Sequence, residues 1–98
     1  MKKKKEVARI WVIEKLCWVE VKPLRFLTFR VAPGFKFFLH KAYKELGFAV
    51  TEITTGARIT FPQKSMTAAV REARTKIQQL GTEKFRKAVD RTMEEHEV

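Results

Sequence analysis

The side chains most often used in catalysis or metal binding are sparse in this chain. His40 and His96 are the only histidines, and Cys17 is the only cysteine. A zinc site takes about four nitrogen or sulfur ligands, so we expect no metal site within one chain. A Cys17–His40 nucleophile pair is formally possible, but a buried cysteine beside Trp18 and a separate strand histidine are the favoured interpretation.

Carboxylates and phosphate-binding loops give no stronger signal. Only Glu6, Glu14 and Glu20 precede Glu45, so the first half offers no obvious acid/base pair. The Thr55–Gly56 turn lacks the GxxxxGK[ST] pattern of a phosphate loop. We therefore predict a protein that is not an enzyme and uses no cofactor. A small nuclease or toxin is a weaker alternative, because RNA cleavage can be built from Arg, Lys and Tyr side chains.

Basic residues interleaved with aromatic residues are the main chemical signal. The net charge is +10, and residues 1–44 hold twelve Lys and Arg against three Glu, whereas residues 45–98 hold nine basic against eight acidic residues. Solubility alone needs no such asymmetry, and an acidic partner would relieve the self-repulsion. Ten of the eleven aromatic residues lie between Trp11 and Phe61. Surfaces that bind nucleic acid place cations against phosphates and aromatic faces against bases.

These features predict a protein that binds nucleic acid, with DNA favoured over RNA. The aromatic residues Trp11, Phe26, Phe37 and Phe61 are interpreted as core residues. Residues 1–6 are expected to form a flexible basic arm. The candidate contacts are Lys2, Lys3, Lys4, Lys5, Arg9, Lys22, Arg25, Arg30, Lys36, His40, Lys41, Lys44, Arg58 and Lys64.

Two helices are expected to follow the basic section. The spacing predicts a helix over 65–80, with Ser65 as its N-cap and Gly81 as the left-handed residue after its end. Thr82 is expected to cap a second helix over 83–96. The apolar face of the first helix is formed by Met66, Ala69, Val70, Ala73, Ile77 and Leu80, and that of the second by Phe85, Ala88, Val89 and Met93.

The section over 7–61 is expected to be mainly β. Residues 48–54 are rich in β-branched side chains and predict a strand. The Thr55–Gly56 turn then leads into a partner strand over 57–61, which Pro62 ends. Upstream, the alternation over 24–31 predicts another strand, and 7–21 holds one or two strands broken near Glu14 and Lys15.

The segment over 35–46 leaves two structures open. Phe35, Phe38, Leu39, Ala42 and Leu46 fit a helix that ends at Gly47. Strand spacing fits the same segment over 35–43, and three phenylalanines in four residues favour this strand interpretation.

Together these elements predict one α+β domain over 1–98. An antiparallel β-meander of three to five strands is followed by two helices that cover one face of it. The other face would present the basic residues. No apolar stretch is long enough for a transmembrane helix, and no signal peptide is visible. With a single cysteine, a reducing cytoplasm is the expected compartment, and no membrane partner is expected.

Part of this pattern resembles known small proteins. The run Phe48–Ile59, followed by Ala68, Ala69 and Ala73, resembles small phage and prophage proteins in which a Thr-Gly hairpin precedes an alanine-containing helix. The order is also similar to the DNA-binding domains at the amino termini of phage and transposon integrases. That resemblance implies a sheet laid in the major groove. The rival hypothesis is a phage-type inhibitor, anti-defence or anti-CRISPR-like, that binds an acidic surface of a host nuclease or defence complex.

Overall fold

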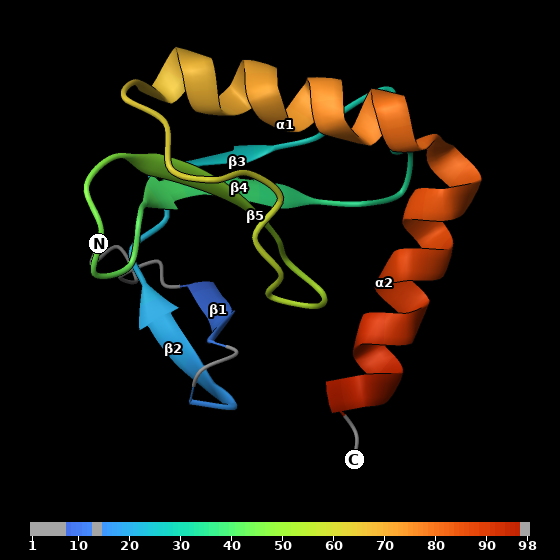
Figure 1. The fold of residues 1–98 in the computed structure, drawn as a ribbon, viewed down its shortest axis with the longest axis horizontal. Coiled ribbons are helices and arrows are strands. Elements are labelled where there is room, and N and C mark those ends of the chain that lie inside the picture. The colour runs from blue at the N-terminus through green and yellow to red at the C-terminus, as the bar shows by residue number, and fades with distance from the viewer. Residues whose placement is uncertain (1–7, 13–14, 97–98) are drawn as a thin grey trace, which may run out of the picture.

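The computed structural model describes residues 8–12 and 15–96, and the side chains of residues 95 and 96 are not described. Over this part of the chain, five strands are followed by two helices (Figure 1), so the predicted α+β class is confirmed. The elements are β1 (Ala8–Val12), β2 (Cys17–Val21), β3 (Arg25–Leu27), β4 (Phe37–Lys41), β5 (Phe48–Glu52), α1 (Met66–Leu80) and α2 (Thr82–His96).

The strands form two antiparallel sheets. β1 and β2 make a hairpin that runs from the pair Ala8–Val21 to the pair Val12–Cys17. β3, β4 and β5 make a second sheet in that order. Pro23 lies between β2 and β3 and has no N–H to give to a ladder, which accounts for the break between the two sheets.

The sequence left strand and helix open for the segment over 35–46. In the structure, Phe37–Lys41 of this segment is a strand, β4, and not a helix. Phe37 and Leu39 pack into the core under α1. Phe38 and His40 point to the opposite face and are also buried. A strand buried on both faces explains the unbroken run of bulky residues.

Two predicted strands are shorter or less regular than expected. The strand predicted over 24–31 ends at Leu27, since Phe29 turns into the core and the amide of Ala32 donates to its carbonyl. The partner strand predicted over 57–61 is an irregular segment that pairs with β5 only at Thr51–Arg58 and Phe48–Gln63. Pro62, which cannot donate to the ladder, lies between these two pairings.

α1 lies across one face of the three-stranded sheet and confirms the helix predicted over 65–80 (Figure 1). Ala69, Ala73 and Ile77 are buried beneath it, and the Ser65 hydroxyl accepts a hydrogen bond from the Ala68 amide as an N-cap. Gly81 has a positive φ of 89°, but its ψ of 152° is extended, so the expected left-handed conformation is wrong there.

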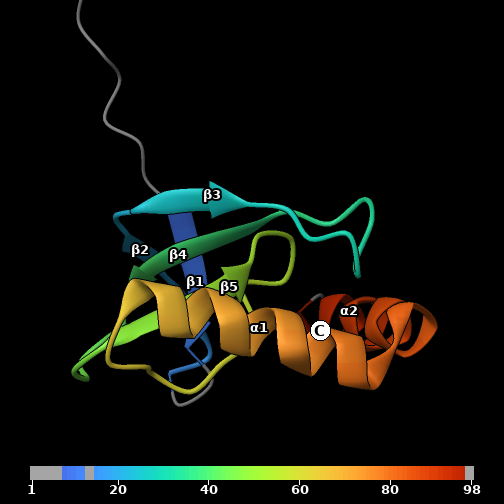
Figure 2. The same cartoon turned by 90° about the horizontal axis from the view of Figure 1, so that it is seen from above.

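α2 departs from the prediction that both helices cover the sheet. It turns away from α1 and runs down beside the end of the sheet (Figures 1 and 2). Its Phe85 ring packs against Phe35 and Phe37, with centroids 5.0 and 5.8 Å apart. Thr82 is not the expected cap, since its hydroxyl donates to the Val31 carbonyl and the Phe85 amide donates to Gly81.

The second face of the three-stranded sheet is not the open basic surface that the sequence predicted. Phe38, His40, Ala49 and Thr51 on this face are all buried. The β1–β2 hairpin lies on this side, opposite α1 (Figure 1). The prediction failed because alternation along a strand shows which residues share a face but not whether another element covers it.

Candidate nucleic-acid interface

Cations from separate segments meet at one end of the three-stranded sheet. Across β4, β5 and the following segment, Lys41 pairs with Phe48 and Phe48 pairs with Gln63, which directly precedes Lys64. Lys44 lies in the β4–β5 turn with a left-handed φ of 56°. We name the four exposed residues Lys22, Lys41, Lys44 and Lys64 the lysine end.

Lys22 joins this group through the start of β3. The Leu24 amide donates to the Leu39 carbonyl at 2.7 Å, which places the residues before Leu24 beside the carboxyl end of β4. Figures 1 and 2 both show the start of β3, the end of β4, the β4–β5 turn and the start of α1 on the same side of the molecule. Three segments that are separate in sequence, around Lys22, Lys41–Lys44 and Lys64, therefore lie at this end of the sheet.

Two further features add positive charge here. The first turn of α1 holds no acidic residue, so the partial positive charge of the helix start is not offset. Lys15, in the β1–β2 turn, reaches the same region, since its Nζ and that of Lys44 lie 6.0 and 5.4 Å from the Tyr43 ring centroid. Lys15 was not among the predicted contacts, because only the fold brings the hairpin turn next to the β4–β5 turn.

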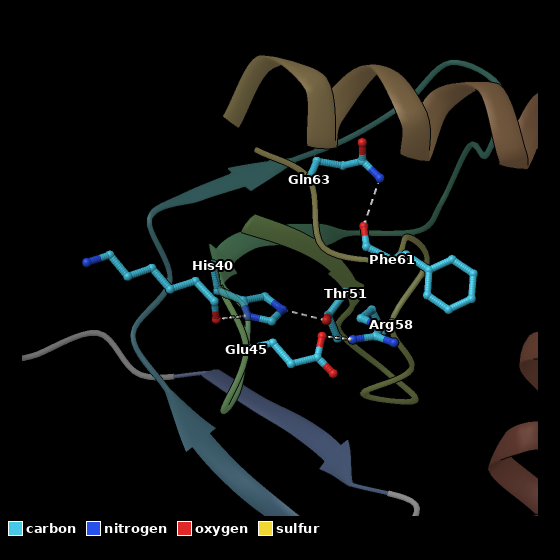
Figure 3. A network of polar contacts seen from close by, with 7 residues as sticks. His40, Glu45, Thr51, Arg58, Phe61 and Gln63 are labelled. Carbon is cyan, nitrogen blue, oxygen red and sulfur yellow. Dashed lines mark hydrogen bonds and ion pairs between the residues drawn. The ribbon is translucent and has the colours of Figure 1, made fainter. Parts of the chain in front are cut away.

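The one carboxylate of the β4–β5 turn is paired. Glu45 Oε2 lies 3.5 Å from Arg58 Nη1 (Figure 3), and both side chains are about half exposed. Exposed pairs of this kind contribute about 0–1 kcal/mol. The pair nevertheless offsets the charge of Glu45 and holds Arg58 near the lysine end.

Arg58 also belongs to a cluster around an exposed ring. Phe61 is 70% exposed. Arg58 Cζ lies 5.5 Å and Lys76 Nζ 4.7 Å from its ring centroid. The interpretation of Phe61 as a core residue is therefore wrong, and so is that of Phe26, which is 51% exposed. Lys76 was not predicted as a contact. It directly precedes Ile77 on the apolar face of the predicted helix, and this position was a signal that Lys76 lies close to the sheet.

His40 is not a surface contact, so its assignment to the binding surface is wrong. The residue is 2% exposed. Its Nδ1 lies 2.8 Å from the Lys41 carbonyl oxygen and its Nε2 lies 2.7 Å from Thr51 Oγ1 (Figure 3). Burial lowers the pKa of His40 below its usual 6.5, and the nearby charge of Arg58 lowers it further. With both ring nitrogens bonded, His40 is not placed to act as a base toward Cys17.

The structure separates the remaining candidates. Arg25 lies on the edge strand β3, two residues after Pro23 and close to the lysine end. Arg30 and Lys36 lie at the other end of the sheet, before β4 begins. Arg9 lies on the hairpin, 4.9 Å from the Trp18 ring centroid. Lys2, Lys3, Lys4 and Lys5 lie outside the described residues.

A second feature is an open cleft of about 530 Å³ between the two helices and the segment Glu52–Ile59. Its lining is mostly apolar and includes Ile59, Ile77 and Val89, together with the cations Arg58 and Lys76. The Glu52 carboxylate is not available to a ligand, because it accepts hydrogen bonds from the amides of Thr54 and Thr55.

Within the described part of the chain, no group of three or more His, Cys, Asp and Glu side chains could hold a metal ion. Neither α1 nor α2, the helices of that part, is long and apolar enough to cross a membrane.

Comparisons with protein-family models, curated proteins and solved structures find no match to this chain. A function for this chain must therefore be inferred from its own residues.

Proposed function

We propose that this chain binds nucleic acid without catalysing a reaction, and that the lysine end is its main phosphate-binding surface. The observation that carries the proposal is the convergence of Lys22, Lys41, Lys44 and Lys64 from three segments at one end of the sheet. Like charges held together repel one another, and a polyanion relieves that repulsion. Phosphate contacts carry no sequence information, so we expect similar affinity for unrelated sequences.

The amino-terminal lysines lie close in sequence to the start of the hairpin. Ala8 pairs with Val21, the residue before Lys22. Lys2–Lys5 precede Ala8 by only three to six residues in the sequence. We expect these lysines to add phosphate contacts to those of the lysine end.

The test is a set of charge reversals with matched controls at the other end of the sheet. Lys41→Glu and Lys64→Glu should each weaken binding to a labelled duplex. Each should also flatten the slope of log affinity against log salt by about 0.9 for every phosphate that the variant no longer neutralises. Lys36→Glu and Arg30→Glu make the same charge change away from the lysine end and should have smaller effects. Equal reductions in affinity for all four variants would show that only net charge matters.

A second candidate function is docking of an acidic protein surface, and the cleft is the observation that favours it. Ala88 lines the cleft, and Lys84 and Arg91 lie on the same stripe of α2, at i−4 and i+3. A mostly apolar lining that also holds cations suits an apolar side chain flanked by carboxylates. Ala88→Glu should abolish binding of such a partner and leave the affinity for duplex DNA nearly unchanged. Loss of duplex affinity in this variant would contradict the assignment of the cleft to a protein.

A further inference from the structure

Phe61 is an apolar ring that the fold leaves in solvent. It lies in the irregular segment beside β5, and 70% of its surface is exposed. A single exposed apolar residue is common and needs no explanation. What distinguishes Phe61 is the pair of cations at its ring, Arg58 at 5.5 Å and Lys76 at 4.7 Å.

The two cations are held near the ring by different parts of the fold. Arg58 pairs with Thr51 across β5 through the backbone, and its guanidinium contacts Glu45. Lys76 is carried by α1, whose neighbouring residues Ala73 and Ile77 are buried against the sheet. Figure 3 shows the Phe61 ring pointing away from the strands, with Arg58 beside it. The cluster therefore joins two elements and does not depend on a chance contact within one loop.

We propose that Phe61, Arg58 and Lys76 form a stacking site for an unpaired base of a single-stranded nucleic acid. An unpaired base offers a flat face to the ring, and its adjoining phosphates offer charge to the cations. A duplex hides the faces of its bases, and the carboxylate of an acidic peptide uses only the cations. This inference rests on the proposed function, because it specifies the form of nucleic acid that the same surface takes.

The site is continuous with the lysine end. Phe61 precedes Lys64 by three residues, which corresponds to at most about 10 Å of extended chain. Arg58 is linked through Glu45 to the turn that carries Lys44. A strand whose phosphates lie on the lysine end can thus place a neighbouring base at Phe61.

The experiment compares a labelled oligothymidylate single strand with a labelled duplex of mixed sequence. Phe61→Ala should weaken single-strand binding by about 5- to 150-fold, the effect of losing one base–aromatic stack. Duplex affinity and melting temperature should stay unchanged, because the side chain is exposed. Phe61→Trp keeps a stacking face and should retain single-strand affinity. Phe26→Ala is the matched control, since Phe26 is 51% exposed on β3.

Three results would overturn the stacking site. In the first, Phe61→Ala binds the single strand as tightly as the unmodified protein, while lysine-end reversals still lose affinity; the proposed function then stands without the stacking site. In the second, Phe61→Ala weakens single-strand and duplex binding equally. In the third, polyglutamate binds with the same dependence on Phe61, which identifies a site for acidic protein. If the unmodified protein binds neither strand nor duplex at low salt, the proposed function itself fails.

Discussion

At the scale of single residues, His40 has a tautomer set by its two partners. The Lys41 carbonyl can only accept a hydrogen bond, so we assign the ring proton to Nδ1. Nε2 is then an acceptor, and the Thr51 hydroxyl donates to it. Protonation of Nε2 would add a charge to a buried ring and reverse the bond to Thr51. His40 is therefore expected to stay neutral in the folded protein.

This arrangement predicts a loss of stability in mild acid. The pKa of His40 is lowered in the folded state by burial, whereas in the unfolded chain it is about 6.5. Below pH 6.5 the unfolded state binds more protons, so the free energy of unfolding should fall by up to about 1.4 kcal/mol per pH unit until the folded pKa is reached. Urea unfolding at several pH values between 5 and 8 measures this fall.

Two variants check that His40 is the cause. His40→Gln should remove the part of the pH dependence below pH 6.5 that this residue supplies. His96→Gln changes the other histidine and should leave the dependence intact. The opposite pattern, with the dependence lost in His96→Gln alone, would contradict the account of the buried ring.

The sequence could not place His40 or Phe61 correctly, and the reason is the same for both. Strand alternation puts His40 on the face opposite Leu39, but it does not reveal that the hairpin side of the sheet is buried. Phe61 looks like a core residue by type, yet Pro62 and the irregular pairing of its segment leave the ring outside. Burial of one side chain depends on elements far away in the chain, which local patterns do not encode.

At the scale of elements, the turn after β5 joins the two sheets. The Trp11 amide donates to the Gly56 carbonyl at 2.8 Å. Gly56 has a φ of 68°, and a Cβ there would collide with the Trp18 ring and lie 2.7 Å from the Trp11 nitrogen. The Glu52 carboxylate holds the turn in place by accepting from Thr54 and Thr55. This turn therefore links the hairpin to the three-stranded sheet.

Gly56→Ala should therefore destabilise the protein by more than its backbone strain alone. Gly34→Ala is the control, because Gly34 also has a positive φ, 88°, but its Cβ would meet nothing within 4 Å. The control should lose about 1–2 kcal/mol, the cost of a left-handed alanine. Gly56→Ala should lose clearly more in urea unfolding. Similar losses for the two variants would show that the contact with the tryptophans is unimportant.

Elements with a strong local signal were predictable, and their packing was not. The apolar period over 65–80 and the Ser65 cap were sufficient for α1, and the β-branched run was sufficient for β5. β3 is shorter than predicted because Phe29 leaves the strand to enter the core. α2 was predicted as a helix, but its course beside the end of the sheet depends on contacts of Phe85 with Phe35 and Phe37.

At the scale of the whole molecule, the positive charge is concentrated by topology. The excess of basic residues lies in residues 1–44, and the sequence pattern assigned them to one open sheet face. In the fold, the carboxyl end of β4, the start of β3 and the start of α1 lie on one side of the molecule (Figure 2), and the lysine end belongs to these segments. Arg30 and Lys36 belong to the same basic half but lie at the opposite end. A polyanion that binds the molecule should therefore bind it at one end.

The most direct test is a nuclear magnetic resonance titration of the labelled protein with an oligothymidylate single strand at low salt. We expect the largest backbone amide shifts in residues 41–47, 61 and 63–66, with small shifts at Arg30, Lys36 and the cleft side of α2. Raising the salt concentration should reduce all of these shifts together, because the counterions compete for the phosphates. Shifts centred on Arg30 and Lys36, or no shifts at any ratio of strand to protein, would contradict the assignment of the lysine end as the phosphate-binding surface.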